Sequence, residues 1–403
     1  MKAVPPRPQM PFARPNILEL APVYEVLRSE APVSAVITPA GDRAWLATGY
    51  RECRELLADK RLGRSHPEPD KAARVSTAAI QDGPTGSYET EEADHTRMRR
   101  LLTPSFSAKR MMSLSGHIQG LVDGFVDDLL AAHDATPDGV VDLHTGLAQP
   151  LPVSVICQLL GVPVGDGDHF RALSERMAGV NDQDDAHSAR EEFSHYMSGL
   201  AEVKRAQPGE DVISDVVAAQ RHDEGFSYDE MVDLCVGLLF AGHETTVNRI
   251  GLGTLFLLTR RDNWLDLVAD PAGRTDACVE EIMRMSAPGD LGLVRYAHTD
   301  LDVAGVTIQR GDAVVLSVNA ANRDPAVYSE SERFDPDRSD QGHLGFGHGP
   351  HFCIGASLAR IEMRIVFATL ARRLPDLRLA ADLEDLEARP TLTGGVASLP
   401  VTW

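Results

Sequence analysis

The chain has 403 residues, of which 43% are hydrophobic and 25% charged, a composition that is ordinary for a globular enzyme. Its formal net charge of -21 argues against nucleic acid as a general partner, because phosphate binding requires a basic surface. The sequence contains no run of about 18 apolar residues, so no membrane-spanning helix is expected. The first 14 residues hold four prolines and no apolar stretch, which indicates neither a signal peptide nor an anchor.

No flexible linker, low-complexity tract or internal repeat divides the chain, and we expect a single domain over residues 1–403. The cysteines lack the spacing of a metal site or of a disulfide framework. Four of them lie in apolar, helical surroundings, which indicates small core residues of a protein in a reducing cytoplasm. The five cysteines are Cys53, Cys157, Cys235, Cys278 and Cys353.

The first 60 residues predict one short helix and one β-hairpin. The helix is expected around residues 18–29. The hairpin is expected from two apolar runs, 33–37 and 44–47, on either side of the turn 39–42. From about residue 95 to 286 the pattern is almost wholly helical, and its breaks fall at Pro-, Gly- or Asp-rich points near 134–139, 161–167 and 207–211.

After these helices, β-branched residues cluster around turns between residues 293 and 318 and predict short strands. An irregular polar stretch over 321–345, a loop around Cys353, a helix to about residue 374 and an extended tail complete the chain. The sequence therefore predicts a mainly α protein with a minor β region near 33–48 and 293–318.

One long helix is predicted in the middle of the chain. Ser227 and Glu230 have the spacing of a capping box, and the helical pattern runs from there to about Leu258. Roughly 31 residues at about 1.5 Å each give a rod of about 47 Å, enough to cross the molecule. Residues 234–242 are apolar on every face, which indicates a helix that is buried all round.

Polar residues interrupt the apolar centre of this helix at Glu244 and Thr245. An acid and a hydroxyl inside a core are costly unless they are satisfied, and Thr245 is placed to donate to the Ala241 carbonyl one turn earlier. Gly242 is expected to leave room for a ligand beside this opening. A polar pair that only bends the helix is the alternative. A zinc site of the H-E-x-x-H type is excluded, because Val247 stands where that motif needs a histidine.

Cys353 lies in the most specific motif of the chain, Phe-Gly-His-Gly-Pro-His-Phe-Cys-Ile-Gly at residues 346–355. Glycines permit backbone geometry that other residues resist, and they allow close approach to a flat ligand. A rigid loop of this kind points N–H groups at the sulfur, and such donors stabilise a thiolate that is able to ligate haem iron. The alternative is a buried structural cysteine in a glycine-rich turn.

This motif resembles the haem-binding loop of the cytochrome P-450 family, F-G-x-G-x-H/R-x-C-x-G, with every fixed position filled. The resemblance extends from about residue 11 to 403. It implies the cytochrome P-450 fold, a triangular prism-like helical domain around haem b, with a long central helix and small β sheets. Cys353 would be the axial ligand of the haem iron. The further haem contacts that the resemblance implies are Phe346, Gly347, Gly355 and Ala241.

The centre of the long helix also resembles a motif of this family, the oxygen-binding groove A/G-G-x-D/E-T. The resemblance implies that Glu244 and Thr245 relay protons to bound O2, the co-substrate. It also implies four contacts to the haem propionates, whose negative charges need cations or hydrogen-bond donors. These four residues are His95, Arg99, Arg295 and His351.

Glu281 and Arg284 are three residues apart in a helical stretch and therefore share a face. On its own, such a pair is usually a surface ion pair of little energetic consequence. Here it matches the E-x-x-R motif of the family, which is completed by an arginine upstream of the cysteine loop. Arg338 is in that position, and the role implied for the three residues is structural.

The resemblance implies that electrons come from external NAD(P)H through a ferredoxin and a ferredoxin reductase, and we expect no fused reductase domain. We expect a basic patch in this acidic chain to receive the ferredoxin; an ordinary solvated helix face is the alternative. The patch comprises Arg97, Arg100, Lys109 and Arg110, with help from Arg360 or Arg364. The protein is expected to be a cytoplasmic monomer.

The function implied is that of a monooxygenase, which inserts one oxygen atom from O2 into a small organic substrate by hydroxylation or epoxidation, as a tailoring step of secondary metabolism. Oxidative coupling or dehydrogenation by the same haem enzyme is one alternative. A non-catalytic haem carrier or sensor is another, and it would not need Glu244 and Thr245. Family placement puts the substrate walls at residues 63–90 and 177–188 and at Phe240, Leu291, Val294, Leu392 and Thr393.

Overall fold

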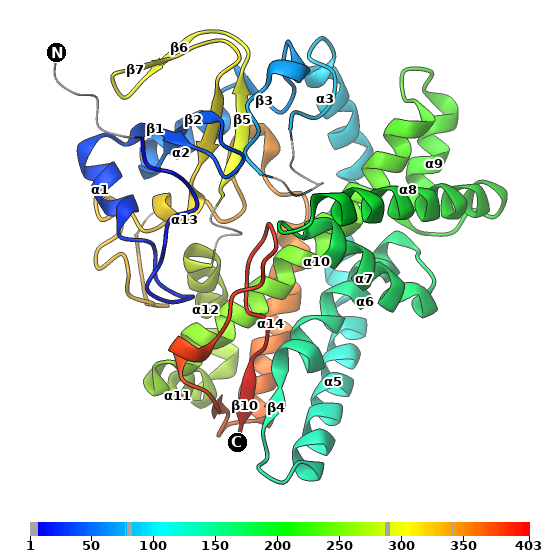
Figure 1. The fold of residues 1–403 in the computed structure, drawn as a ribbon. Coiled ribbons are helices and arrows are strands. Elements are labelled where there is room, and N and C mark those ends of the chain that lie inside the picture. Colours follow the sequence, from blue (N-terminus) through cyan, green and yellow to red (C-terminus); the bar gives the residue numbers. More distant parts are fainter. Residues whose placement is uncertain (1–6, 77, 79–82, 287–290, 341) are drawn as a thin grey trace.

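The computed structural model describes residues 7–76, 78, 83–286, 291–340 and 342–403. Figure 1 shows a region of strands and short helices at the upper left and a larger region of long helices to the right and below. Within the described residues, no helix combines the length and the apolar character needed to cross a bilayer.

The principal sheet joins the N-terminal hairpin to the β-rich stretch near residue 300, in the order β1-β2-β8-β5-β3. The hairpin pairs β1 and β2 antiparallel, as predicted, while β2 runs parallel to β8. The strands of this principal sheet are β1 (Val33–Ile37), β2 (Arg43–Ala47), β3 (Leu62–Gly63), β5 (Leu293–Ala297) and β8 (Ala313–Leu316). The other strands are β4 (Val141–Asp142), β6 (Leu301–Val303), β7 (Val306–Ile308), β9 (Arg378–Leu379) and β10 (Pro400–Thr402).

The helices account for most of the remaining chain. They are α1 (Val23–Glu30), α2 (Tyr50–Ala58), α3 (Glu91–Leu102), α4 (Ala108–Ser113), α5 (Ser115–Ala135), α6 (Pro150–Leu160), α7 (Gly167–Ala178), α8 (Gln183–Ala206), α9 (Val212–His222), α10 (Tyr228–Leu258), α11 (Arg261–Ala269), α12 (Pro271–Met285), α13 (Val318–Ala321) and α14 (Ala356–Arg373). Single turns of helix lie at Pro69–Lys71, His144–Ala148, Val164–Asp166, Gly349–His351 and Leu383–Asp385. The first helix begins later than predicted, because Pro22 occupies its N-cap and residues 18–21 precede it without helical structure.

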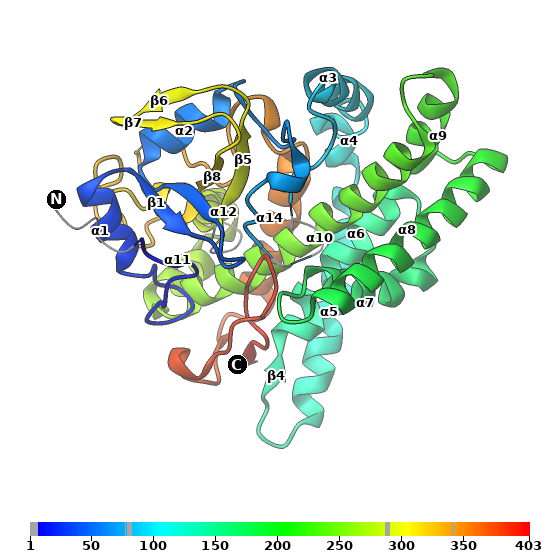
Figure 2. The same ribbon diagram turned by 45° about the horizontal axis from the view of Figure 1, so that its top comes forward.

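The long central helix is confirmed as α10, and Figure 2 shows it crossing the molecule. Its first turn is held by a capping box, in which the Glu230 backbone N–H donates to Ser227 Oγ at 3.2 Å and the Ser227 N–H donates to Glu230 Oε2 at 2.7 Å. This exchange satisfies two of the backbone donors that every helix N-terminus leaves open.

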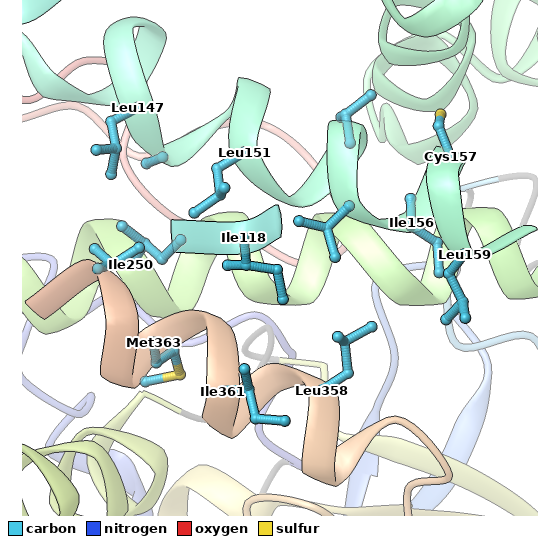
Figure 3. Packing of buried hydrophobic residues seen from close by; sticks show 14 of the residues in the cluster. Ile118, Leu147, Leu151, Ile156, Cys157, Leu159, Ile250, Leu358, Ile361 and Met363 are labelled. Carbon is cyan, nitrogen blue, oxygen red and sulfur yellow. The ribbon is translucent and has the colours of Figure 1, made fainter. Parts of the chain in front are cut away.

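A dry core fixes α10 against α5, α6 and α14 (Figure 3). Ile118 from α5, Leu151 from α6, Ile250 from α10 and Met363 from α14 are all fully buried in one cluster. Close packing of this kind leaves little freedom for the helices to shift. The core therefore fixes two elements relative to each other: the middle of α10 and the chain that enters α14, which contains Cys353.

The tail after α14 forms a hairpin over residues 387–397 and then strand β10. Within it, the Arg389 N–H donates to the Gly395 carbonyl at 2.9 Å. Its tip contacts the α7–α8 connection, where the Leu392 N–H donates to the Ala178 carbonyl at 2.9 Å and Gly179 bridges Thr391. The tail thus reaches back over the central helix, as the loop drawn in red and orange in Figure 1 shows.

Candidate active site

The cysteine loop is built from tight turns that need glycine. Gly347 and Gly349 have φ values of 73° and 71°, a region that L side chains rarely adopt. A Cβ on Gly349 would also lie 2.7 Å from the Ala58 Cα, so the loop packs directly on the backbone of α2. The Cys353 N–H donates to the Phe346 carbonyl at 2.9 Å and closes the loop.

Cys353 is the only exposed one of the five cysteines. The other four are buried, as predicted for small core residues. The protein around the loop displaces water from the Cys353 thiol and raises its pKa, while the Gly355 N–H and the charges of Arg249, Arg99 and Arg360 act in the opposite direction. Burial prevails, so the pKa of the free thiol lies above its usual value, whereas the donor and the three cations would stabilise the sulfur as a thiolate on a metal.

The middle of α10 has an open face. Ala241 is exposed and Thr245 is half-buried, although most of the neighbouring residues of this helix are buried. Thr245 Oγ1 donates to the Ala241 carbonyl at 3.1 Å, as expected from the sequence. The helix thus leaves a hydroxyl and a small side chain uncovered in its otherwise buried middle.

The expectation that Gly242 makes room for a ligand is wrong. A Cβ at this position would lie 2.6 Å from Ile156 Cδ1 and 2.7 Å from Ile156 Cγ1. The glycine therefore serves the close contact between α10 and α6, on a side of the helix that the core fills.

Glu244 is held by two partners from the C-terminal hairpin. Arg389 donates from Nη2 to Glu244 Oε1 at 3.0 Å and from Nη1 to Oε2 at 3.3 Å, while Thr393 Oγ1 donates to Oε2 at 2.7 Å. The Glu244 side chain is only 2% exposed. Burial alone would raise the pKa of Glu244, but the charges of Arg389 and His243 and the two donors bring it below its usual value. Glu244 is therefore an ionised carboxylate in a buried ion pair.

A cluster of two arginines and two histidines from three segments lies beside the cysteine loop, and we call it the cation cluster for its charged arginines. The rings of His95 and His351 lie 4.1 Å apart between their centroids, and Arg99 Nη1 donates to the Phe352 carbonyl at 3.1 Å. Arg295 is buried and donates to the Val294 carbonyl. Burial, followed by Arg64, Arg295, His95 and Arg99, lowers the pKa of His351 to about 3.

The structure brings together all four residues that the sequence proposed for propionate binding, and it adds Arg64. The positive charge of Arg64 also lowers the pKa of His95 and that of Arg295. The sequence analysis placed Arg64 only within the expected substrate wall at residues 63–90 and missed its part in this cluster. Mutual depression of pKa values among so many basic groups shows excess positive charge, which an anionic ligand would relieve.

Glu281, Arg284 and Arg338 form one buried network. Arg284 binds Glu281 through Nε to Oε2 at 2.8 Å and through Nη2 to Oε1 at 2.7 Å, and Arg338 Nε lies 3.4 Å from the same Oε1. Arg284 also donates to the carbonyls of Asn322 and Ser331. The network joins α12 to the irregular stretch before the cysteine loop.

The family model described as cytochrome P-450 matches residues 274–375. Pentalenolactone synthase of Streptomyces exfoliatus is 39% identical over 408 residues, which cover 98% of this chain and 99% of that protein. The chain belongs to the cytochrome P-450 family. The cytochrome P-450 monooxygenase PikC of Streptomyces venezuelae is 38% identical over 384 residues, covering 95% of this chain and 90% of that one. The solved structure of the putative thioether synthase SgvP, 33% identical, superposes with a TM-score of 0.89 over 98% of this chain and all of the other.

Membership confirms the fold, haem b as the cofactor and O2 as the co-substrate of a monooxygenase that receives electrons from NAD(P)H through redox partners. The residues in hand fit this group. Cys353 presents an exposed sulfur that would hold the iron, the middle of α10 presents Ala241 and Thr245, and the cation cluster would bind the two propionates. Phe346 and Gly347 would contact the group from the loop, with Gly355 beside the sulfur.

The residues that the sequence proposed as substrate walls lie in different settings. Phe240 is buried, whereas Leu291, Val294 and Leu392 are half-buried. Thr393 is buried, and Glu244 accepts its hydrogen bond, so this hydroxyl is engaged within the protein. Within the proposed wall at 63–90, residues 77 and 79–82 lie outside the described part of the chain.

The proposed basic patch is largely neutralised by acids of the same chain. Arg97 pairs with Asp94, Arg110 with Asp215, Arg360 with Glu280 and Arg364 with Asp276. Arg100 and Lys109 are exposed, and neither has an ion pair with another described residue. The patch therefore carries less free charge than the sequence suggests.

Proposed function

We propose that Cys353 ligates the iron of haem b and that the enzyme inserts one oxygen atom from O2 into a small organic substrate, as a tailoring step of secondary metabolism. The observation that carries this proposal is the exposed Cys353 sulfur, which a loop with positive-φ glycines at Gly347 and Gly349 presents. The relatives named above support the pathway class, because pentalenolactone synthase and PikC are both Streptomyces enzymes of this family.

The bound haem supplies the oxidising chemistry, and the protein supplies position, protons and electronics. Cys353 donates to the metal as a thiolate. Thr245 Oγ1 holds and passes a proton at the open face of α10, and the ionised Glu244 lies directly before it in the helix. The cation cluster orients the group through its propionates, and the half-buried walls hold the substrate.

Product mass tests the reaction. The purified enzyme would first be screened for candidate substrates that shift the haem spectrum. Each such substrate would then be turned over with NADPH, a surrogate ferredoxin and a reductase, and the mass of its product would be measured by mass spectrometry. A gain of one oxygen supports the proposal. A loss of two hydrogens would favour oxidative coupling or dehydrogenation, and the likeness to a putative thioether synthase gives that second function its own support.

Thr245→Ala is expected to bind substrate as before but to release its reducing equivalents as peroxide. A positioned proton donor contributes roughly 10²-fold or more, so product formed per NADPH consumed should fall by about that factor. Thr245→Ser, which retains the hydroxyl, should recover most of the coupling. Thr254 makes the same bond to the carbonyl four residues earlier but is buried, so Thr254→Ala serves as the matched control. Full coupling in Thr245→Ala would remove this hydroxyl from the proton path.

Arg389→Met is expected to leave Glu244 buried without its counter-charge. Breaking one partner of a buried pair costs about 3–5 kcal/mol of folding stability. Without Arg389, burial dominates and the pKa of Glu244 lies above its unfolded value. The destabilisation is then largest at high pH and fades as the pH falls through that raised pKa.

Thermal unfolding at several pH values measures this effect. The difference in unfolding temperature between wild type and Arg389→Met should become smaller from pH 8 toward pH 5. Adding Glu244→Gln to the variant should recover stability at pH 8. The exposed pair of Arg333 and Glu330 supplies the control, because Arg333→Gln should cost under about 1 kcal/mol at any pH. A gap that is independent of pH would show that Arg389 does not set the charge of Glu244.

We further propose that residues 1–403 form one domain, that the protein works as a cytoplasmic monomer, and that it is reduced by a ferredoxin that docks near Arg100 and Lys109. Five unpaired cysteines fit a reducing compartment.

Exposed charges act over about 8–10 Å at physiological salt, so the double variant Arg100→Ala, Lys109→Ala should be reduced by ferredoxin several-fold more slowly than wild type at low salt and little more slowly at high salt. Stopped-flow measurement of the reduction rate tests this docking site, and a rate that does not depend on salt would argue against it. Light scattering tests whether the protein is a monomer.

A further inference from the structure

Arg249 is a buried cation one turn after Thr245 on α10. Its side chain is 3% exposed, and its two terminal nitrogens are fixed by neutral groups. Nη1 donates to Ser286 Oγ at 3.1 Å, and Nη2 donates to the Gly345 carbonyl at 3.1 Å. Gly345 stands at the start of the cysteine loop, so this guanidinium links the central helix to the chain that presents the sulfur.

Arg249 differs from most other buried arginines in lacking a carboxylate. Arg284 pairs with Glu281, Arg323 with Glu332 and Arg389 with Glu244, whereas none of the described residues forms an ion pair with Arg249. A buried charge without a partner is costly, so such a group normally has an anion nearby. Arg295 is the comparable case, and it belongs to the cation cluster that suits the propionates.

Among the described residues, the one anionic group that acts on Arg249 is the Cys353 sulfur. The loop that Arg249 binds at Gly345 continues directly to Phe346, whose carbonyl accepts the Cys353 N–H at 2.9 Å. The sulfur is close enough for its charge to act on the Arg249 guanidinium and to raise the pKa of Arg249. Burial brings the pKa of Arg249 down to about 9, so it is still a cation at neutral pH.

We propose that Arg249 is a positioning residue that sets the reduction potential of the haem iron, by supplying a fixed positive charge against the thiolate that ligates it. The inference rests on the proposed role of Cys353 as the axial ligand. Reduction adds one electron to a site that already carries the charge of the thiolate. A buried cation stabilises the reduced form more than the oxidised form, because its field is poorly screened inside the protein.

The experiment is a potentiometric titration of the purified, haem-loaded protein without substrate, with dithionite as reductant and redox dyes as mediators. Arg249→Met removes the charge and keeps similar bulk. Its ferrous-to-ferric equilibrium should move about tenfold toward the ferric form, which is a potential lower by about 59 mV for one electron. The shift should persist at high salt, because a buried charge is little screened.

Two variants separate the charge from a bracing role. Arg249→Lys keeps the cation and should keep the potential close to that of the wild type. Ser286→Ala removes one hydrogen-bond partner of Arg249 but no charge, so its potential should also stay close to that of the wild type. Arg373→Gln is the control for loss of a remote cation, because Arg373 ends α14, is half-buried and pairs with Asp127. If Arg249→Met does not fold, Arg249→Gln takes its place.

The outcomes are distinct. A lower potential in Arg249→Met with retention in Arg249→Lys supports the proposal, whereas an unchanged potential in Arg249→Met, or an equal fall in both variants, overturns it. The carbon monoxide spectrum of the wild type separates this inference from the proposed function. A wild type without the thiolate-type band would refute Cys353 as the ligand, irrespective of Arg249.

Discussion

Cys353→Ser is expected to abolish the thiolate-type absorption band of the reduced carbon monoxide complex and to remove monooxygenase activity. The axial sulfur pushes electron density toward bound oxygen, and a serine hydroxyl is not a comparable donor. Loss of an outer-shell partner at a metal site already costs about 10–100-fold, so loss of the ligand itself should cost more. The measurement is the difference spectrum of the purified variant, together with product formation per haem.

Cys157→Ala is the matched control for this change. Cys157 is a buried core residue of α6 and lies within the packing shown in Figure 3. Its truncation should lower stability by about 1–2 kcal/mol, because a small cavity replaces the sulfur, and should leave the spectrum intact. A Cys353→Ser protein that retained the thiolate-type band would exclude Cys353 as the ligand and would direct attention to the buried thiols.

The parts of the site that could be predicted from the sequence are those whose geometry is local. The capping box at Ser227 and Glu230 and the bond from Thr245 to Ala241 span three or four residues, so spacing along one helix defines them. The turns at Gly347 and Gly349 could likewise be predicted from the residues that form them, because positive φ angles favour glycine.

The features that sequence reasoning missed depend on contacts between distant segments. Arg389 reaches Glu244 across 145 positions, from a tail that reads only as extended chain. Arg64 joins the cation cluster from a loop with no motif of its own. The purpose of Gly242 follows from Ile156 on a neighbouring helix, and a pattern within α10 alone holds no information on that neighbour.

Charge was the least predictable property. The sequence shows basic residues along α3 and α4, but Arg97 pairs with Asp94 on its own helix, and Arg110 pairs with Asp215 on the distant α9. Counting charges along one segment therefore overstates the field that it presents. The central acid Glu244 illustrates the same point, because its ionisation is decided by the hairpin folded over it.

Glu281→Ala is expected to prevent accumulation of stable, haem-loaded protein. The change leaves Arg284 and Arg338 facing each other with side chains 2% and 7% exposed and no shared carboxylate. It also removes the acceptor of the Asp335 backbone N–H, which donates to Glu281 Oε1 at 2.8 Å. Breaking a buried pair costs about 3–5 kcal/mol, a large share of the about 5–15 kcal/mol that holds a typical protein folded.

The ion pair of Arg274 and Asp337 supplies the matched control for Glu281→Ala, because it joins α12 to the same irregular stretch but lies at the surface. Its side chains are 28% and 68% exposed, so Asp337→Asn should cost under about 1 kcal/mol. Chemical unfolding of the two variants beside the wild type measures the difference. Similar losses would mean that the stretch before the cysteine loop is held by packing alone. A loss confined to Glu281→Ala would show that the buried carboxylate, by satisfying two arginines and a backbone donor together, fixes the platform on which Cys353 is presented.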